Sequence, residues 1–241
     1  MKAIIDLTLL GILIICAWNG YKKGLIMAVG GIVCIVVSIY GANLLANTFS
    51  YDVVPALRPF ATGYIESVIG GRDSAVTKRM GWEDYNYSVE DLLAQYPDRV
   101  EEYCTECYKE LGVDARTAET MAKKAVVQAE ESGSTIHAAI GQTLCETASY
   151  VGCFLLAFLL IVITLTVLGN LTNLSFKLPR FDLINDISGA VLGLVTGVLC
   201  CLDLVWALKF TGMIIGKDTL NSTVLGRWLM NSRVLLKYLG I

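Results

Sequence analysis

The chain has 241 residues, of which 55% are hydrophobic and 17% are charged, with a formal net charge of −3 at pH 7. A soluble domain is about 45–50% apolar and about 25% charged, so the composition argues against an ordinary soluble protein. Residues 50–145 hold nine Lys and Arg against sixteen Asp and Glu, whereas the rest of the chain holds ten against six. An acidic middle between apolar, slightly basic ends predicts a membrane protein with one large aqueous loop.

The first hydrophobic run is residues 3–18, interrupted only by Asp6. A removable signal peptide is the alternative to a retained helix. However, no cleavage site of small residues follows the run, which continues into CAWNGYKKG. A lipoprotein attachment at Cys16 is also disfavoured, because bulky Ile15 precedes it. We therefore expect a retained helix.

Three further runs follow at residues 24–46, 147–176 and 187–208, and the only charge within them is Asp203. About 20 largely apolar residues suffice to cross a bilayer, and a chain in lipid must pair its own backbone groups. The prediction is an all-α membrane protein with four transmembrane helices. Its expected parts are a first transmembrane hairpin (1–48), an acidic soluble loop region (49–145), a second hairpin (146–212) and a C-terminal tail (213–241).

The two expected short turns are basic, with Lys22 and Lys23 in one and Lys177 and Arg180 in the other. Positive charge favours the cytoplasmic side, which places the N-terminus, the large loop and the C-terminus outside. The basic residues of the C-terminal tail argue for the opposite orientation: Lys217, Arg227, Arg233 and Lys237. We favour the first orientation.

The acidic loop shows helix signals rather than the composition of a disordered segment. Ser88 with Asp91 three residues later predicts a helix start that continues through residue 111, and Asp114 precedes a second helical pattern. A third helix is expected to begin near Ser134 and to run directly into the third span. The loop is therefore predicted to be a small helical subdomain.

The C-terminal segment from residue 217 onward alternates apolar and cationic residues at a spacing of three and four. This pattern predicts an amphipathic helix. Such a helix can lie in the membrane interface, or it can pack on the loop subdomain.

Three glycines fall four residues apart in the last hydrophobic run: Gly189, Gly193 and Gly197. Each costs a helix about 1 kcal/mol relative to alanine. In lipid, helices associate through close approach and dispersion, which small residues permit. The stripe therefore predicts a packing surface for another helix, either of the same chain or of a second copy.

The string LINDISGAVLGLVTG resembles the signature of the colicin V production protein (CvpA-like) family, with Asn185 followed by glycines four apart. Gly20 and Gly24 around a basic turn, Asp6 near the start and NSTVLGRWL near the end resemble that family too. The resemblance covers the four spans and the tail but not residues 50–145, and Asp186 stands where a basic residue often follows. It implies a multi-pass protein of the bacterial inner or plasma membrane, linked to colicin V production and envelope integrity.

No enzyme signature is present in the sequence, which lacks a P-loop, a dinucleotide fingerprint and a hydrolase elbow. His137 is the single histidine, for which an exposed surface position is the simplest interpretation. Cys104 and Cys107 form one CxxC, which is half of a zinc ribbon without its other half, so structural thiols or an incidental disulfide are expected. We expect no catalysis, no cofactor, no metal and no nucleic-acid partner.

Asp6 and Asp203 are the charges within the predicted spans, and antiparallel helices would place both near one face of the membrane. They form either a polar gate or proton-linked site, or simply reach interfacial water. Two functions remain open. One is a non-catalytic scaffold that contacts other membrane or envelope proteins through residues 50–145. The other is a transporter or channel component, which with four spans would need a homo-oligomer.

Overall fold

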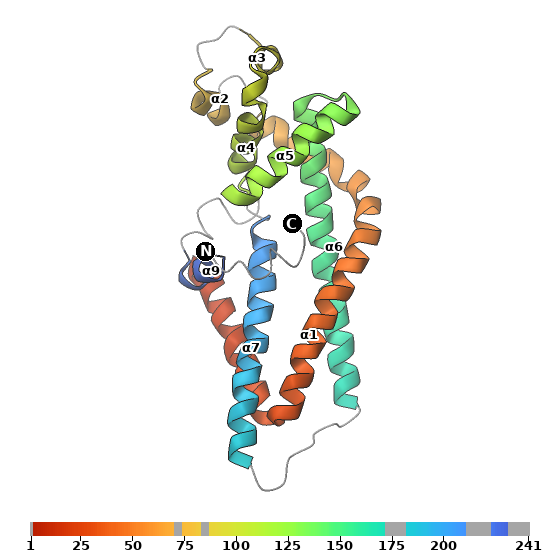
Figure 1. Cartoon of the computed structure of the whole chain (residues 1–241), viewed down its shortest axis with the longest axis vertical. Helices are drawn as coiled ribbons and strands as arrows, with labels where there is room; N and C mark the ends of the chain where they lie inside the picture. Colours follow the sequence, from red (N-terminus) through yellow and green to blue (C-terminus); the bar gives the residue numbers. More distant parts are fainter. Residues whose placement is uncertain (1, 70–73, 83–86, 172–181, 211–222, 231–241) are drawn as a thin grey trace. The chain divides into compact units, whose positions relative to one another are not determined.

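The computed structural model describes residues 2–69, 74–82, 87–171, 182–210 and 223–230, and over these ranges every regular element is helical. The predicted all-α class is confirmed for this part of the chain (Figure 1). The helices are α1 (Lys2–Ile69), α2 (Ala75–Met80), α3 (Val89–Gln95), the 3₁₀ turn η1 (Pro97–Arg99), α4 (Val100–Glu110), α5 (Ala115–Ser132), α6 (Ile136–Leu171), α7 (Asp182–Leu208) and α9 (Val224–Met230).

Three of these helices are long and apolar enough to cross a membrane, over Ala3–Ile69, Ile136–Gly169 and Ile184–Leu208. Large apolar side chains on them are exposed, for example Leu7 at 70%, Leu156 at 68% and Val191 at 60%. Such surfaces are unfavourable in water and are suited to lipid. The three helices fit a membrane protein.

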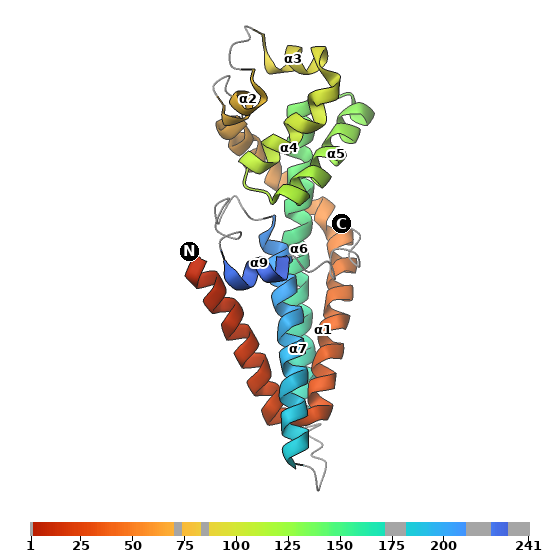
Figure 2. The same ribbon diagram turned by 60° about the vertical axis from the view of Figure 1, so that its left-hand side comes forward.

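Helix α1 contains two of the predicted hydrophobic runs, and it has a break at Gly24, where the second run begins. This residue has φ 78° and ψ 179°, a conformation that only glycine adopts without strain. We call residues 2–23 the first arm of α1 and residues 25–69 the second arm. The views in Figures 1 and 2 both show the chain turning sharply where the arms meet.

The contacts of α7 show that the turn at Gly24 reverses the chain. On the first arm, Gly20 lies against Gly189 whereas Leu13 lies against Gly197, so the first arm runs antiparallel to α7. At the break, Gly24 lies against Asn185, and Gly31 of the second arm lies against Thr196 farther along α7. The second arm therefore runs parallel to α7, and the two arms form a hairpin.

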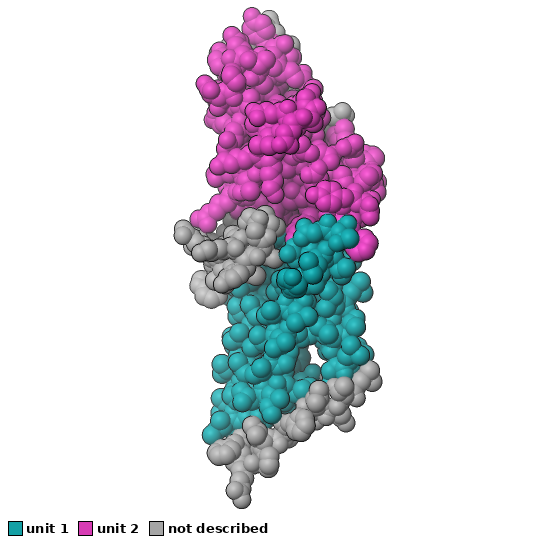
Figure 3. Space-filling view, turned by 45° about the vertical axis from the view of Figure 1, so that its right-hand side comes forward, with its two compact units in different colours: residues 1–48, 152–208, 219–241 teal, residues 49–151, 209–218 magenta. Residues whose placement is uncertain are grey.

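The chain divides into two compact units, coloured separately in Figure 3. Unit 1 comprises residues 1–48, 152–208 and 219–241, and unit 2 comprises residues 49–151 and 209–218. Within unit 2, the end of the second arm packs on the start of α6: the Ser149 hydroxyl donates to the Ser50 carbonyl, and Arg58 Nε donates to Gln142 Oε1 at 3.2 Å. Both long helices thus extend well beyond the hydrophobic runs that predicted them.

The core of unit 2 is the contact between α4 and α5. The buried face of α5 consists mostly of alanines at helical spacing: Ala118, Ala122, Ala125 and Ala129. Small side chains let α4 approach closely, and the largest fully buried side chains of this region, Tyr103 and Tyr108, come from α4. A helical subdomain can therefore be packed although the sequence offers few large aliphatic residues here.

The helix signals of the loop have mixed outcomes. Ser88 and Asp91 form a capping box, in which Ser88 Oγ accepts from the Asp91 N–H at 3.1 Å, as predicted. The prediction of one continuous helix from Ser88 to residue 111 was wrong. The 3₁₀ turn η1 separates α3 from α4, because Pro97 has no N–H with which to continue α3. Helix α5 begins directly after Asp114, whose side chain makes no capping hydrogen bond. Helix α6 runs without a break into the apolar segment, as predicted.

Candidate functional site

The glycine stripe of α7 lies against the first arm of α1 in a close backbone contact. A Cβ atom built at Gly20 would lie 2.9 Å from the Cα of Gly193, and one built at Gly193 would lie 3.0 Å from the Cα of Gly20. A Cβ at Gly197 would meet the Cβ of Cys16 at 3.1 Å. We call the contact of Gly189, Gly193 and Gly197 with residues 13–20 the glycine seam. Its partner helix belongs to the same chain.

Asn185 lies one helical turn before the seam and is 4% exposed. Its Oδ1 accepts a hydrogen bond from the backbone N–H of Leu25 at 2.9 Å. Leu25 is the first residue of the second arm and directly follows the non-helical Gly24, and the first N–H groups of a helix have no acceptor within that helix. The Asn185 side chain thus caps the second arm. It also fills the space beside Gly24, where any Cβ would collide with the Asn185 amide group.

Asp6 caps another helix. Its Oδ2 accepts from the backbone N–H of Val224 and its Oδ1 from that of Leu225, both at 3.1 Å. These are the first two N–H groups of α9, and a carboxylate at this end also complements the helix dipole. Leu229 of α9 packs with Leu9 and with α7 residues Cys201 and Val205.

Helix α9 carries part of the expected amphipathic tail, and Asp6 holds it against the first arm of α1. The remaining residues of that prediction, 217–222 and 231–241, lie outside the described part of the chain. So do Lys177 and Arg180 of the second basic turn.

Asp203 lies on α7 and is 1% exposed. No group in the described residues makes a hydrogen bond to its Oδ1. The two carboxylates therefore have different surroundings: Asp6 is bound by backbone N–H groups, whereas Asp203 is buried among unit 1 side chains. No hydrogen bond or ion pair links the two among the contacts of the described segments.

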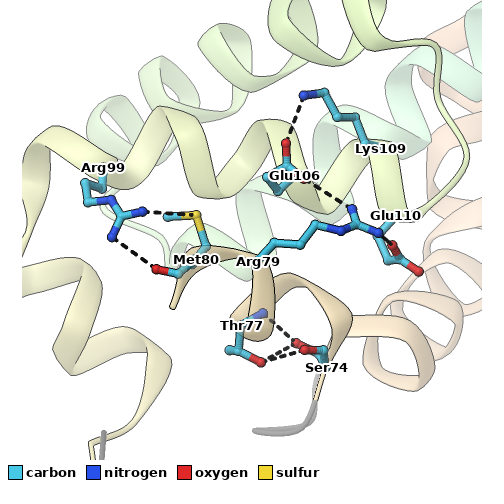
Figure 4. A network of polar contacts seen from close by, with 8 residues as sticks. All are labelled: Ser74, Thr77, Arg79, Met80, Arg99, Glu106, Lys109 and Glu110. Atoms are coloured by element: carbon cyan, nitrogen blue, oxygen red, sulfur yellow. Dashed lines mark hydrogen bonds and ion pairs between the residues drawn. The ribbon is translucent and has the colours of Figure 1, made fainter. Parts of the chain in front are cut away.

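A charged network that the sequence did not indicate ties α2 to α4 (Figure 4). Arg79 contacts Glu106 Oε2 at 3.2 Å and Glu110 Oε2 at 2.6 Å, and Lys109 Nζ contacts Glu106 Oε1 at 2.8 Å. The hydrogen bond from Lys109, assisted by that from Arg79, lowers the pKa of Glu106. The Glu106–Lys109 spacing is readable from sequence, but the approach of α2 is not.

His137 is not the freely exposed residue that the sequence suggested. Its side chain is 25% exposed, and its Nε2 lies 2.9 Å from the hydroxyl of Tyr103, which is fully buried. Its Nδ1 lies 3.6 Å from Glu90 Oε1. Burial raises the pKa of Tyr103 far above its ordinary value, so the phenol stays neutral and can donate to the imidazole. This arrangement joins α3, α4 and α6 at one point in unit 2.

The CxxC cysteines are free thiols, and both are fully buried in α4. Burial raises the pKa of Cys104 to about 12 and that of Cys107 further still. A buried, protonated thiol is neither a nucleophile nor a metal ligand. In the part of the chain that the structure describes, no group of three His, Cys, Asp or Glu side chains is arranged to hold a metal ion.

Comparisons with known proteins give no relative: no family model, no curated protein and no solved structure matches this chain.

Proposed function

We propose that the chain is a four-span membrane protein that acts as a non-catalytic scaffold or assembly factor, with unit 2 as its docking platform. The observation that carries the proposal is the construction of unit 2. A packed set of helices, α2–α5, lies between the extended ends of α1 and α6, which are the same two helices that carry apolar spans. A folded platform held by two membrane helices is suited to presenting a surface to partners rather than to catalysis.

The reversal at Gly24 supports the proposal of four spans, because it divides α1 into two arms. The first arm has 22 residues, enough for about 33 Å of helix, which matches the hydrocarbon thickness. The part of the second arm within unit 1 is of similar length, and α6 and α7 supply the other two spans. Both turns would then lie on one side of the membrane, with the termini and unit 2 on the other.

Cysteine labelling of intact cells tests the orientation, which we propose places unit 2 outside. In a cysteine-free background, Glu119→Cys in unit 2 should react with an impermeant maleimide, whereas Lys22→Cys in the turn should react only after permeabilisation. Both side chains are exposed. The reverse labelling would invert the orientation. Labelling of both positions from the same side would contradict the four-span arrangement.

The biological role proposed rests on the resemblance of LINDISGAVLGLVTG and the flanking motifs to the CvpA-like family. It suggests a bacterial plasma-membrane protein that supports toxin production or export, or envelope homeostasis. Photo-crosslinking from unit 2 in living cells tests this. A photoreactive residue at Glu119 should capture discrete membrane or envelope proteins, whereas one at the exposed, lipid-facing Leu156 should not. Equal capture at both sites, or none at either, would count against a docking platform.

A transporter or channel component is the second candidate, and the buried, unpaired Oδ1 of Asp203 is the observation that favours it. Buried carboxyl groups within spans often mark ion or proton paths. Flux of protons and of Na⁺ or K⁺ in proteoliposomes separates the candidates. The scaffold proposal expects no flux above protein-free vesicles, whereas a transporter expects flux that Asp203→Asn abolishes while Asp6→Asn does not.

A further inference from the structure

Two thiols meet at the glycine seam. Cys16 of the first arm lies opposite Gly197, where a built Cβ would be 3.1 Å from its own Cβ. Cys200 is three residues beyond Gly197, on the next turn of the same helix face. The thiol groups of Cys16 and Cys200 lie close enough to interact directly. The small residues of the seam let the first arm approach α7 closely at this point.

The pair differs from the other six cysteines. Cys16 and Cys200 are both partly accessible, whereas the neighbouring Cys201 is buried and its thiol points to the Leu9 carbonyl at 3.6 Å. Cys34 and Cys153 are also partly accessible free thiols. The remaining three, Cys104, Cys107 and Cys145, are buried.

We propose that Cys16 and Cys200 form a reversible redox pair that links the first arm covalently to α7. The oxidant is a membrane-permeant acceptor of two electrons and two protons, of the quinone or azo class. Two S–H bonds break and one S–S bond forms, while the acceptor takes up both electrons and both protons. A dithiol reductant reverses the step by thiol–disulfide exchange. Since the first arm also carries Asp6, the oxidised link holds the segment that caps α9.

The azo oxidant diamide provides the test, with the purified full-length protein in detergent. After oxidation, free thiols are blocked with N-ethylmaleimide and the protein is digested without reductant for mass spectrometry. The expected result is one linked peptide pair, joining Cys16 to Cys200 within one chain and lost after dithiothreitol. The oxidised protein should also show a higher midpoint of thermal unfolding, because a cross-link between distant residues restricts the unfolded chain.

Matched variants give the controls. Cys16→Ser and Cys200→Ser should each abolish the linked pair and the shift in the midpoint, whereas Cys201→Ser and Cys34→Ser should retain both. The proposal is overturned if diamide leaves Cys16 and Cys200 open to N-ethylmaleimide, if Cys16 pairs with Cys201, or if cross-links form only between two copies. The wild-type peptide map decides the matter even where a serine variant fails to fold.

Discussion

Asn185 Oδ1 accepts the backbone N–H of Leu25 at 2.9 Å, across 160 residues of chain. The bond fixes the reversal of α1 to the start of α7. It also explains why Gly24 must lack a side chain, since the Asn185 amide group occupies the position that a Cβ would take. One polar side chain therefore closes the turn between the two arms and sets the register of the glycine seam beside it.

Asn185→Ala should destabilise this turn. The substitution removes the acceptor of the partly buried Leu25 N–H, and an unsatisfied buried donor costs about 1–3 kcal/mol, so the loss should lie at the lower end of this range. Thermal unfolding in detergent, followed by circular dichroism, measures the loss. Ile187→Ala on the same helix is the control, because Ile187 is 54% exposed and its truncation removes surface that faces detergent. Equal midpoints for the two variants would show that the Asn185 cap contributes nothing.

Asp6→Ala should release the start of α9 from the first arm of α1. Two N–H groups at the start of α9 lose their acceptor, and loss of a helix cap costs about 0.5–2 kcal/mol. Hydrogen exchange at Val224 and Leu225 should therefore accelerate, while exchange within α4 and α5 stays unchanged. Asp6→Asn keeps one acceptor oxygen and should give intermediate exchange rates. Unchanged protection in Asp6→Ala would mean that α9 is held by Leu229 packing alone.

The charged network of Figure 4 should make unit 2 sensitive to acid. Because the Glu106 pKa is lowered from its ordinary value of 4.5, the carboxylate contributes stability above about pH 4.5 and loses it as the pH falls through the lowered value. Glu106→Gln should cost about 0.5–1 kcal/mol at pH 7, a modest value because the partners are partly exposed.

The Glu106 variant should approach the wild type in stability as the pH falls below the lowered pKa of Glu106, where the wild-type carboxylate is protonated as well. Unfolding midpoints from pH 3 to pH 7 measure the difference. Glu101→Gln is the matched control, because Glu101 is 54% exposed and lies 4.0 Å from Lys123. A constant gap between Glu106→Gln and wild type over this range would contradict the linkage.

Local patterns in the sequence predicted several of these features, but not their long-range partners. The spacing of Gly189, Gly193 and Gly197 shows that they share a helix face, and Asn185 is in register with them, four residues earlier. The Ser88 capping box was readable because both members lie within one turn. The acceptors for Leu25 and Val224 were not readable, because each lies far away in sequence and is set by how the helices pack. The same holds for the approach of Arg79 to Glu106.

The glycine seam gives the most direct test of the packing in unit 1. Even a Cβ atom built at Gly193 would lie only 3.0 Å from the Cα of Gly20. The isobutyl group of Gly193→Leu is much larger, so the first arm must move away from α7. Overpacking of this kind costs about 1–3 kcal/mol. The added leucine should not impair membrane insertion, because it makes the span more apolar.

The expected outcome for Gly193→Leu is therefore split: normal amounts in the membrane fraction, but a lower midpoint of thermal unfolding in detergent. Leu194→Ile is the control one position along, where the side chain is 49% exposed and little should change. A second effect separates close packing from a general loss of stability. Moving the first arm away from α7 should also part Cys16 from Cys200, so diamide should no longer link them in Gly193→Leu. Equal midpoints and equal cross-linking in the two variants would show that the glycines do not form a contact surface.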